Sequence, residues 1–497
     1  MKKVVFLTGA TGTMGFETLK KLLENQDDLH VRVLARDSKK NREMLAPYLD
    51  NIELLWGDLK DDDVLKQGVT GADYVLHIGA LVSPMADAFP EETLRINYGS
   101  TLCMLKAIKE LGQKDTTHFV YIGTVAQTGD RMPPIHWGRI GDPMKPSIYD
   151  YYALSKVYSE RAVMESGLKY WASIRQTGMM PSNEAAASLP ILSHHPANNV
   201  LEWSNAEDSG NLMRNICTMA PDHFWGKAYN LSGGVDYRQT NFTQYVNLGL
   251  DERLLTEPNW LALHNFHGHY YLDADDLEAV VPFRTKSYQE FMGEMNAKSY
   301  QQMQMAMQMD PNFKPPTIEE IRAGFKAAMS KPSGVLQFVA DNDEERIKVW
   351  FGSREKYEAI PKTWDEFILY KPLDLPGTPL NRGFDETKPV EELDIVDMQQ
   401  AAKFRGGECL SETMIKGDLY TPLKWRCAQG HVFEACPYTV LFAGHWCQEC
   451  LCGEWRFGEM AEESPFFAQA WDPLHKGEEP FRVKMVIDAK DIEKLYS

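Results

Sequence analysis

The first 23 residues predict a strand, a glycine turn and a helix in immediate succession. The apolar run from Lys3 to Thr8 predicts a short buried strand, and apolar residues recur at helical spacing from Phe16 to Leu23. Between them lies Gly9-Ala10-Thr11-Gly12-Thr13-Met14-Gly15. Such a turn brings backbone N–H groups and a helix N-terminus up to a pyrophosphate, and glycines are needed where side chains would block the approach. The stretch therefore predicts a dinucleotide-binding unit.

Strand and helix signals continue to alternate through the first half of the chain. Strands are expected at His30–Ala35, Ile52–Leu55, Asp73–Ile78, Phe119–Ile122 and Trp171–Gln176, and Thr93–Leu111 predicts one of the intervening helices. This alternation predicts an α/β fold, a Rossmann-type doubly wound parallel sheet whose ligand lies at the carboxyl ends of the strands. The residues directly after three of those ends are Gly57-Asp58, Gly79-Ala80 and Gly123-Thr124.

The second expected strand ends in Arg36-Asp37. An acidic residue there would accept hydrogen bonds from a ribose 2′-OH, whereas an arginine can pair with a 2′-phosphate. Because Arg36 comes first and Lys39 and Lys40 follow closely, the sequence favours NADP over NAD. A basic surface turn that binds no ligand is the alternative.

A tyrosine precedes a lysine by one helical turn in Tyr152-Ala153-Leu154-Ser155-Lys156. The two side chains share a helix face, and a nearby positive charge lowers a phenol pKa from about 10 towards working pH. Tyr152 is therefore a candidate proton donor or acceptor. The alternative is two unrelated residues on a solvated helix face.

Length and charge narrow the classes of protein to consider. At 497 residues the chain is too long for one hydrophobic core, so two or three domains are expected. Its net charge of −19 (52 basic minus 71 acidic residues) argues against nucleic-acid and anionic-membrane binding. No apolar run approaches the roughly 20 residues of a membrane helix. We therefore expect a cytoplasmic protein whose eight cysteines are thiols or metal ligands.

The last part of the chain differs in character from the rest. After an extended, proline-rich connection at Pro372–Pro379 come two ligand pairs, Cys427-x-x-x-His431 and Cys447-x-x-Cys450. Four soft or borderline ligands of this type suit tetrahedral zinc. Cys452 could compete with Cys450 as a ligand. The alternative is that the four side chains bind no metal.

Taken together, the motifs of the first 240 residues or so resemble those of extended short-chain dehydrogenases/reductases. The resemblance rests on Thr-Gly-x-x-Gly-x-x-Gly at Thr8–Gly15, Gly57-Asp58, His77-Ile78-Gly79-Ala80, Asn97, Thr124 and Tyr152-x-x-x-Lys156-x-x-x-Glu160. It implies that Tyr152 is the general acid/base, that Lys156 holds the ribose hydroxyls, and that Thr124 hydrogen-bonds the substrate oxygen. It also implies that Asp58 contacts the adenine and that Asn97 steadies the active-site helix. The implied cofactor-binding residues are Thr8, Gly9, Thr11, Gly12, Thr13, Met14, Gly15, Arg36, Asp58, Leu59, Gly79, Ala80, Tyr152 and Lys156.

Two departures from the family pattern bear on the reaction. Members that dehydrate nucleotide sugars carry Asp-Glu after the active-site hydroxyl residue, whereas Val125-Ala126 follow Thr124 here. Epimerases often have Ser-Ser before that position, and here it is Ile122-Gly123. A net oxidation or reduction of a ketone, aldehyde or alcohol is therefore favoured.

The pattern around the second cysteine pair, Gly444-x-Trp446-Cys447-x-x-Cys450, is similar to treble-clef or zinc-ribbon modules of bacterial proteins. That resemblance implies a structural metal with Cys427, His431, Cys447 and Cys450 as its four ligands.

These interpretations predict three units: an NADP-binding Rossmann domain with part of a substrate lobe at 1–240, a lobe extension and linker at 241–387, and a zinc-binding module at 388–497. The predicted function is an NADP(H)-dependent oxidoreductase for a small-molecule substrate, with a homodimer as one hypothesis for its assembly. The alternatives are a sugar epimerase that retains NAD(P), and a non-catalytic cofactor-sensing scaffold.

Overall fold

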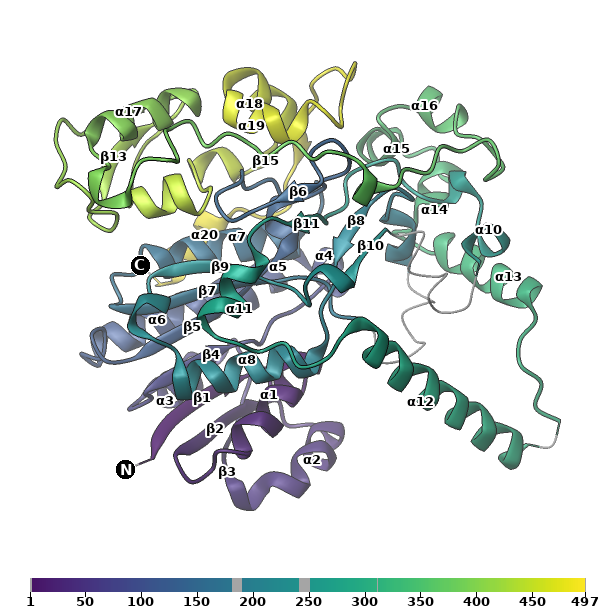
Figure 1. Cartoon of the computed structure of the whole chain (residues 1–497), viewed down its shortest axis with the longest axis horizontal. Helices are drawn as coiled ribbons and strands as arrows, with labels where there is room; N and C mark the ends of the chain where they lie inside the picture. The colour runs from purple at the N-terminus through teal and green to yellow at the C-terminus, as the bar shows by residue number, and fades with distance from the viewer. Residues whose placement is uncertain (1, 181–189, 241–250, 311, 497) are drawn as a thin grey trace.

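A seven-stranded parallel sheet forms the centre of the computed structural model, which describes residues 2–180, 190–240, 251–310 and 312–496 (Figure 1). The strand order is β3-β2-β1-β4-β5-β7-β9, and every pairing in it is parallel. The order runs one way from β1 through β2 and the other way through β4, which places a topological switch point at the end of β1. The predicted Rossmann-type fold is confirmed. The strands are β1 Lys3–Thr8, β2 Leu29–Ala35, β3 Ile52–Trp56, β4 Tyr74–His77, β5 His118–Thr124, β7 Tyr170–Gln176 and β9 Lys227–Leu231.

Helices cover both faces of this sheet because successive strand residues point to opposite sides. Val5 of β1 packs in a core with residues of α1 and α8, whereas the next residue, Phe6, packs in a second core with residues of α3 and α6. These helices are α1 Thr13–Leu23, α2 Lys39–Leu45, α3 Asp62–Val69, α6 Ser100–Glu110, α7 Tyr151–Met164 and α8 Ala206–Met219.

The predicted helix at Thr93–Leu111 is not one regular helix. It comprises the end of α5 (Pro90–Thr93), a π-helical turn at Leu94–Gly99 and α6. Asn97 lies in the π turn and hydrogen-bonds the backbone of Leu81 through both its amide oxygen and its amide nitrogen. A turn widened in this way often marks a functional site, and periodicity alone does not reveal it.

The middle of the chain forms small strand pairs and a group of helices that lies to the right of the sheet in Figure 1. Two-stranded pairs join β8 to β10 and β6 to β11. The elements are α4 Met85–Ala88, β6 Trp137–Gly138, β8 Val200–Glu202, β10 Arg238–Thr240, α10 Glu252–Leu255, β11 Tyr270–Tyr271, α11 Ala274–Val280, α12 Tyr288–Met309, α13 Ile318–Met329, α14 Val335–Ala340, α15 Glu344–Phe351 and α16 Arg354–Glu358.

The C-terminal region packs directly on the sheet domain, above α7 in Figure 1. Trp425 shares a buried apolar core with Phe119 of β5, and Trp455 shares another with Tyr158 of α7. A continuous core therefore joins this region to the sheet. Its elements are α17 Ile395–Phe404, β12 Glu408–Cys409, β13 Leu423–Arg426, β14 Val432–Ala435, β15 Glu454–Trp455, α18 Phe457–Glu463, α19 Pro465–Trp471, β16 Val483–Lys484 and α20 Ala489–Tyr496.

Among the described helices, none combines the length and the apolar character that crossing a membrane requires.

Candidate active site and cysteine–histidine cluster

The glycine turn between β1 and α1 is shaped by close backbone contacts. Gly9 has φ +77°, and a Cβ there would lie 2.7 Å from Cα of Gly79. A Cβ at Gly15 would lie 2.0 Å from the Gly9 carbonyl oxygen. Gly12, by contrast, is exposed and begins α1 without any side-chain cap. The first N–H groups of α1 are thus left for an anion, so the turn fits a dinucleotide pyrophosphate.

The remaining residues of the turn divide between the surface and the core. Thr13 is exposed and Thr11 is partly exposed, whereas Met14 is buried in the core shared with α8. Only the backbone of Met14 is therefore in a position to meet a cofactor.

A buried histidine ties the turn to the sheet. His77, at the end of β4, lies between the Thr8 hydroxyl (Nδ1 to Oγ1, 3.0 Å) and the Ser100 hydroxyl (Nε2 to Oγ, 3.2 Å). The Thr8 hydroxyl also accepts the N–H of Gly79 at 3.0 Å. Burial lowers the pKa of His77 to about 3, so the ring is neutral at physiological pH.

We expect His77 to make the protein less stable in mild acid. Its folded-state pKa lies below the ordinary value of about 6.5, so between these values the unfolded chain binds a proton that the folded chain does not. The contribution of His77 to stability is therefore full above pH 6.5 and is lost as the pH falls, by about 2 kcal/mol at pH 5. The free energy of unfolding can be measured with denaturant above pH 6.5 and at pH 5. It should fall less between these two conditions for His77→Gln than for the wild type. His223→Gln, at an exposed site, serves as the control and should leave the loss unchanged; an equal loss in all three proteins would contradict the assignment.

Tyr152, Lys156 and Thr124 come together between α7 and the end of β5. Asp150 caps α7 by accepting the N–H of Ala153 at 2.7 Å. The helix therefore begins at Tyr151, and Tyr152 lies in its first turn. The Tyr152 phenol lies near the Thr124 side chain, which acts to lower its pKa. The Lys156 ammonium lies 5.8 Å from the centre of the Tyr152 ring and donates to the Ile122 carbonyl at 2.7 Å.

The pKa values of this pair are set by desolvation. Desolvation raises the pKa of Tyr152 to about 12, although the Thr124 side chain acts in the opposite direction. Burial lowers the pKa of Lys156 to about 7. The lowered phenol pKa expected from the sequence is therefore wrong for this arrangement, because the loss of water, together with the charge of Asp150, outweighs the influence of Thr124. Tyr152 is a protonated phenol at neutral pH.

Asn97 connects the π turn to the active-site helix. Its Nδ2 donates to the Ser155 hydroxyl at 2.9 Å, and Ser155 lies between Tyr152 and Lys156 on α7. Its Oδ1 accepts the N–H of Leu81 at 2.8 Å. These bonds hold α7 against the segment that follows β4.

The ends of β2 and β3 carry the residues expected to meet the adenosine half of a dinucleotide. Asp37 is engaged by Arg42, whose Nε and Nη2 each lie 2.6 Å from a carboxylate oxygen. Arg36 is exposed, and within the described ranges its guanidinium forms no ion pair. Asp58 is half-buried after β3, and Leu59 lies against the Gly79 backbone.

Sequence reasoning missed a carboxyl pair at the start of α7. Asp87 Oδ1 accepts the N–H of Tyr151 at 3.1 Å, and burial together with the charge of Asp150 raises the pKa of Asp87 to about 8. His267 Nδ1 lies 3.7 Å from Asp150 Oδ2. Asp87 lies in α4, which follows β4, and outside the motifs that predicted the site. Acidic groups thus lie beside Tyr152 although none follows Thr124.

Residues 5–203 match the model of the NAD dependent epimerase/dehydratase family. The matched residues make up about two fifths of the chain, and they are called the epimerase/dehydratase domain here after that model. This domain includes the glycine turn, Thr124, Tyr152 and Lys156.

Curated relatives share parts of the epimerase/dehydratase domain. The 3 beta-hydroxysteroid dehydrogenase/Delta 5-->4-isomerase of vaccinia virus (strain Western Reserve) is 27% identical over 192 residues, which cover 35% of this chain and 52% of that protein. The D-erythronate dehydrogenase of Cupriavidus necator is 29% identical over 136 residues, 26% of this chain and 41% of that protein. The chain thus spans about half the length, or less, of these relatives.

Solved structures with a similar arrangement include a dTDP-glucose 4,6-dehydratase from Streptomyces venezuelae with NAD bound. It has a TM-score of 0.48 and 19% identity, over 60% of this chain and 96% of the other. L-threonine 3-dehydrogenase from Trypanosoma brucei has a TM-score of 0.46 and 17% identity, over 60% of this chain and 97% of the other.

A buried ion network joins the epimerase/dehydratase domain to the C-terminal region. Glu160, one turn after Lys156, receives Arg175 (Nη2 to Oε2, 2.8 Å), Gln127 (2.8 Å) and His445 (2.8 Å). Gln127 in turn accepts the backbone N–H of Thr124 at 2.7 Å. A residue of the C-terminal region is therefore linked through two side chains to the backbone of a candidate active-site residue.

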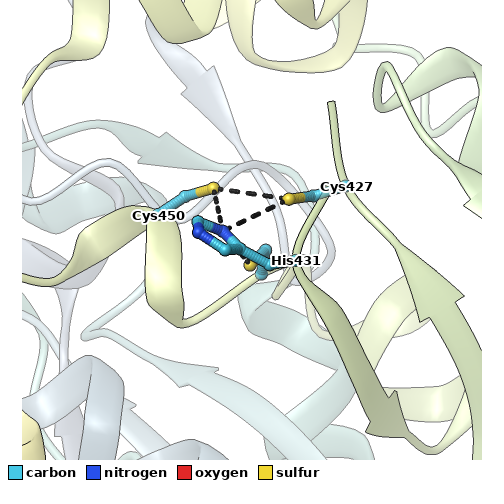
Figure 2. A group of neighbouring side chains, drawn as sticks. Cys427, His431 and Cys450 are labelled. Atoms are coloured by element: carbon cyan, nitrogen blue, oxygen red, sulfur yellow. Dashed lines mark hydrogen bonds between the residues drawn. The ribbon is translucent and has the colours of Figure 1, made fainter. Parts of the chain in front are cut away.

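The four candidate metal ligands converge at a hairpin tip and an adjoining turn (Figure 2). Cys427 follows β13 and His431 precedes β14, while Cys450 lies in the 3₁₀ turn Glu449–Leu451 and Cys447 lies just before it. His431 Nδ1 lies 3.5, 3.6 and 3.5 Å from Sγ of Cys427, Cys447 and Cys450, and Sγ of Cys427 lies 3.7 Å from Sγ of Cys450.

These separations agree with those around a tetrahedral zinc ion. Zn–S and Zn–N bonds of ordinary length require about 3.8 Å between two sulfurs and about 3.6 Å between sulfur and nitrogen. All four residues fit the metal, and none of the eight cysteines is in a disulfide. Cys452 points elsewhere, with Sγ 3.4 Å from the Gln448 carbonyl and 3.8 Å from the Tyr158 hydroxyl, so it does not compete with Cys450.

Proposed function

We propose that the protein is an NADP(H)-dependent oxidoreductase that interconverts a small-molecule ketone or aldehyde and its alcohol, with Tyr152 as proton donor and acceptor. One observation carries the proposal. Tyr152 lies near Thr124 and one turn before the buried Lys156, at the strand ends where the glycine turn fits a pyrophosphate. A phenol and a hydroxyl that meet in this way can together hold one carbonyl oxygen.

Each residue then has a defined task. NADP(H), when bound, supplies or takes the hydride. Lys156 uses one of the three donors of its ammonium on the Ile122 carbonyl and offers the others to ribose hydroxyls. Thr124 and Tyr152 orient the substrate oxygen, and Tyr152 gives it a proton during reduction. The pKa of about 12 keeps the phenol protonated, which suits the reducing direction at neutral pH.

We further propose that Cys427, His431, Cys447 and Cys450 bind one structural zinc ion. The four ligand positions are filled by protein, which leaves no open position for substrate. The zinc then stabilises the loop that carries His445, and His445 reaches Glu160 on the active-site helix.

An epimerase that retains its NAD(P) is the second candidate, and Asp87 favours it. A carboxyl with a pKa of about 8 beside the start of α7 offers a second proton donor near Tyr152. A non-catalytic cofactor sensor is less consistent with the site, because binding alone would not require the Thr124–Tyr152 pair.

The proposal is tested by supplying the purified full chain with NADPH or NADH and a panel of small ketones and aldehydes. Net oxidation of free cofactor supports the oxidoreductase. Interconversion of sugar epimers with no net change in a tightly retained cofactor would instead support the second candidate. Stoichiometric binding of cofactor with turnover in neither assay would overturn both.

Cofactor choice is tested at Arg36. Arg36→Ala should weaken NADP(H) binding by roughly 1.5–3 kcal/mol, the scale of a hydrogen bond between charged groups, and leave NAD(H) binding almost unchanged. Binding can be measured by titration calorimetry. Lys109→Ala, which removes an exposed charge from the last turn of α6, is the matched control. Equal losses for NADP(H) and NAD(H) would show that Arg36 does not contact the 2′-phosphate.

A further inference from the structure

A second group of metal-type ligands lies outside both sites described above. His264, in the segment before β11, meets His475 and Glu478, which follow α19 in the C-terminal region. One ligand atom from each lies within 4.8 Å of the others, and the two imidazole rings are 4.6 Å apart between centres. All three side chains are nearly inaccessible to solvent: His264 is 5% exposed, Glu478 4% and His475 7%.

Three buried polar atoms of this group lack a hydrogen-bond partner among the described residues: Nδ1 and Nε2 of His264 and Oε2 of Glu478. Neither ring nitrogen of His264 has a hydrogen-bond partner within the described ranges, although its Nε2 lies 3.3 Å from Glu478 Oε1. Oε2 of Glu478 is also buried and has no hydrogen-bond partner in the part of the chain that the structure describes. Leaving such groups buried and unsatisfied costs about 1–3 kcal/mol each. A cation placed between the three side chains would bind one ring nitrogen of His264 and a carboxylate oxygen of Glu478.

The surroundings orient the ligands as a metal site requires. His475 Nδ1 is 2.9 Å from the Trp471 carbonyl and must donate to it, so its Nε2 is the nitrogen left with a lone pair. Lys356 holds Glu478 Oε1 at 2.8 Å. A Cβ at Gly352 would lie 2.3 Å from that oxygen, so a glycine is required for the carboxylate to enter the site.

The local charge is compatible with a dication. Asp130 and Lys145 form a fully buried ion pair next to the histidines, and the two charges offset each other. Glu478 is then the carboxylate of the group itself, paired on one oxygen with Lys356, whose side chain is 41% exposed. A dication would therefore meet this carboxylate and two imidazoles.

We propose that His264, His475 and Glu478 bind a divalent transition-metal ion of the zinc type. Two imidazoles and one carboxylate suit Zn²⁺, Co²⁺ or Ni²⁺ and do not suit Mg²⁺ or Ca²⁺, which prefer oxygen ligands. This metal links the segment after α19, which carries His475 and Glu478, to the segment before β11, which carries His264 and supports the active-site helix. The neighbouring Asn265 accepts the N–H of Ile148 at 2.8 Å, two residues before the Asp150 cap of α7.

Cobalt titration of the metal-depleted full chain tests the proposal. The cysteine cluster should take up one Co²⁺ with intense sulfur-to-metal charge-transfer absorption. The second site should take up another Co²⁺ with weak d–d bands alone, since it has no sulfur ligand. Excess Mg²⁺ should not displace either ion. His475→Gln and His264→Gln should each lose the second equivalent and keep the first, whereas His223→Gln should bind two.

The outcomes are decisive whether or not a variant folds. Saturation of the wild type at one equivalent, with charge-transfer bands only, would overturn the proposal. A second equivalent that persists in a folded His475→Gln protein would also overturn it. If both variants fail to fold, the absorption bands of the second Co²⁺ equivalent in the wild type test the proposal. Sulfur-to-metal charge-transfer bands from that equivalent would show that the ion binds elsewhere, and they would overturn the proposal.

Discussion

Replacing Tyr152 by phenylalanine should lower kcat by roughly 10²–10⁴-fold while leaving NADP(H) affinity nearly intact, because general acid catalysis is lost without a change in ring packing. Thr124 remains to bind the substrate oxygen but cannot give it a proton as readily. Steady-state kinetics with NADPH and a reducible substrate, together with a cofactor titration, measure the two effects separately.

Two further variants define the role of Tyr152 more closely. Tyr151→Phe removes a phenol from the adjacent residue, whose hydroxyl accepts the Val486 N–H at 2.9 Å, and should leave kcat nearly unchanged. Lys156→Ala should reduce both cofactor binding and turnover, since it removes the ammonium that faces both. Wild-type turnover in Tyr152→Phe would refute the assignment.

Replacing Cys447 by serine should remove the zinc of the cysteine cluster and unfold the surrounding region. Structural zinc contributes about 10–16 kcal/mol in small modules, which is comparable to the whole stability of a typical domain of 5–15 kcal/mol. The loop from Gly444 to Cys450 would then release His445 from Glu160, so activity should also fall. Metal analysis, thermal unfolding and turnover measure the three consequences.

Cys452→Ser is the matched control for Cys447→Ser. Cys452 lies two residues beyond a ligand but outside the cluster, so its replacement should leave the zinc in place and the stability within about 1 kcal/mol of wild type. Absence of zinc from the wild-type cluster would refute the site. Zinc that binds an inhibitor directly would refute its structural role.

Local spacing was enough to predict those features that depend on neighbours along the chain. The strand, turn and helix from Lys3 to Leu23 form as predicted, because buried apolar periodicity and glycines act over a few residues. Tyr152 and Lys156 share one face of α7 for the same reason. Within each ligand pair, Cys427 with His431 and Cys447 with Cys450, the spacing sets which two ligands can meet.

Other properties depend on segments that are distant in the sequence. The pKa of Tyr152 rises rather than falls because the folded chain removes water from around it. Helix α4 brings Asp87 to the start of α7, and the C-terminal region brings His445 to Glu160. The meeting of His264 with His475 spans more than two hundred residues. The sequence by itself determined the sheet domain and the types of residue available for chemistry, whereas only the tertiary structure decided their burial, their protonation and their distant partners, because desolvation and long-range contacts arise from packing.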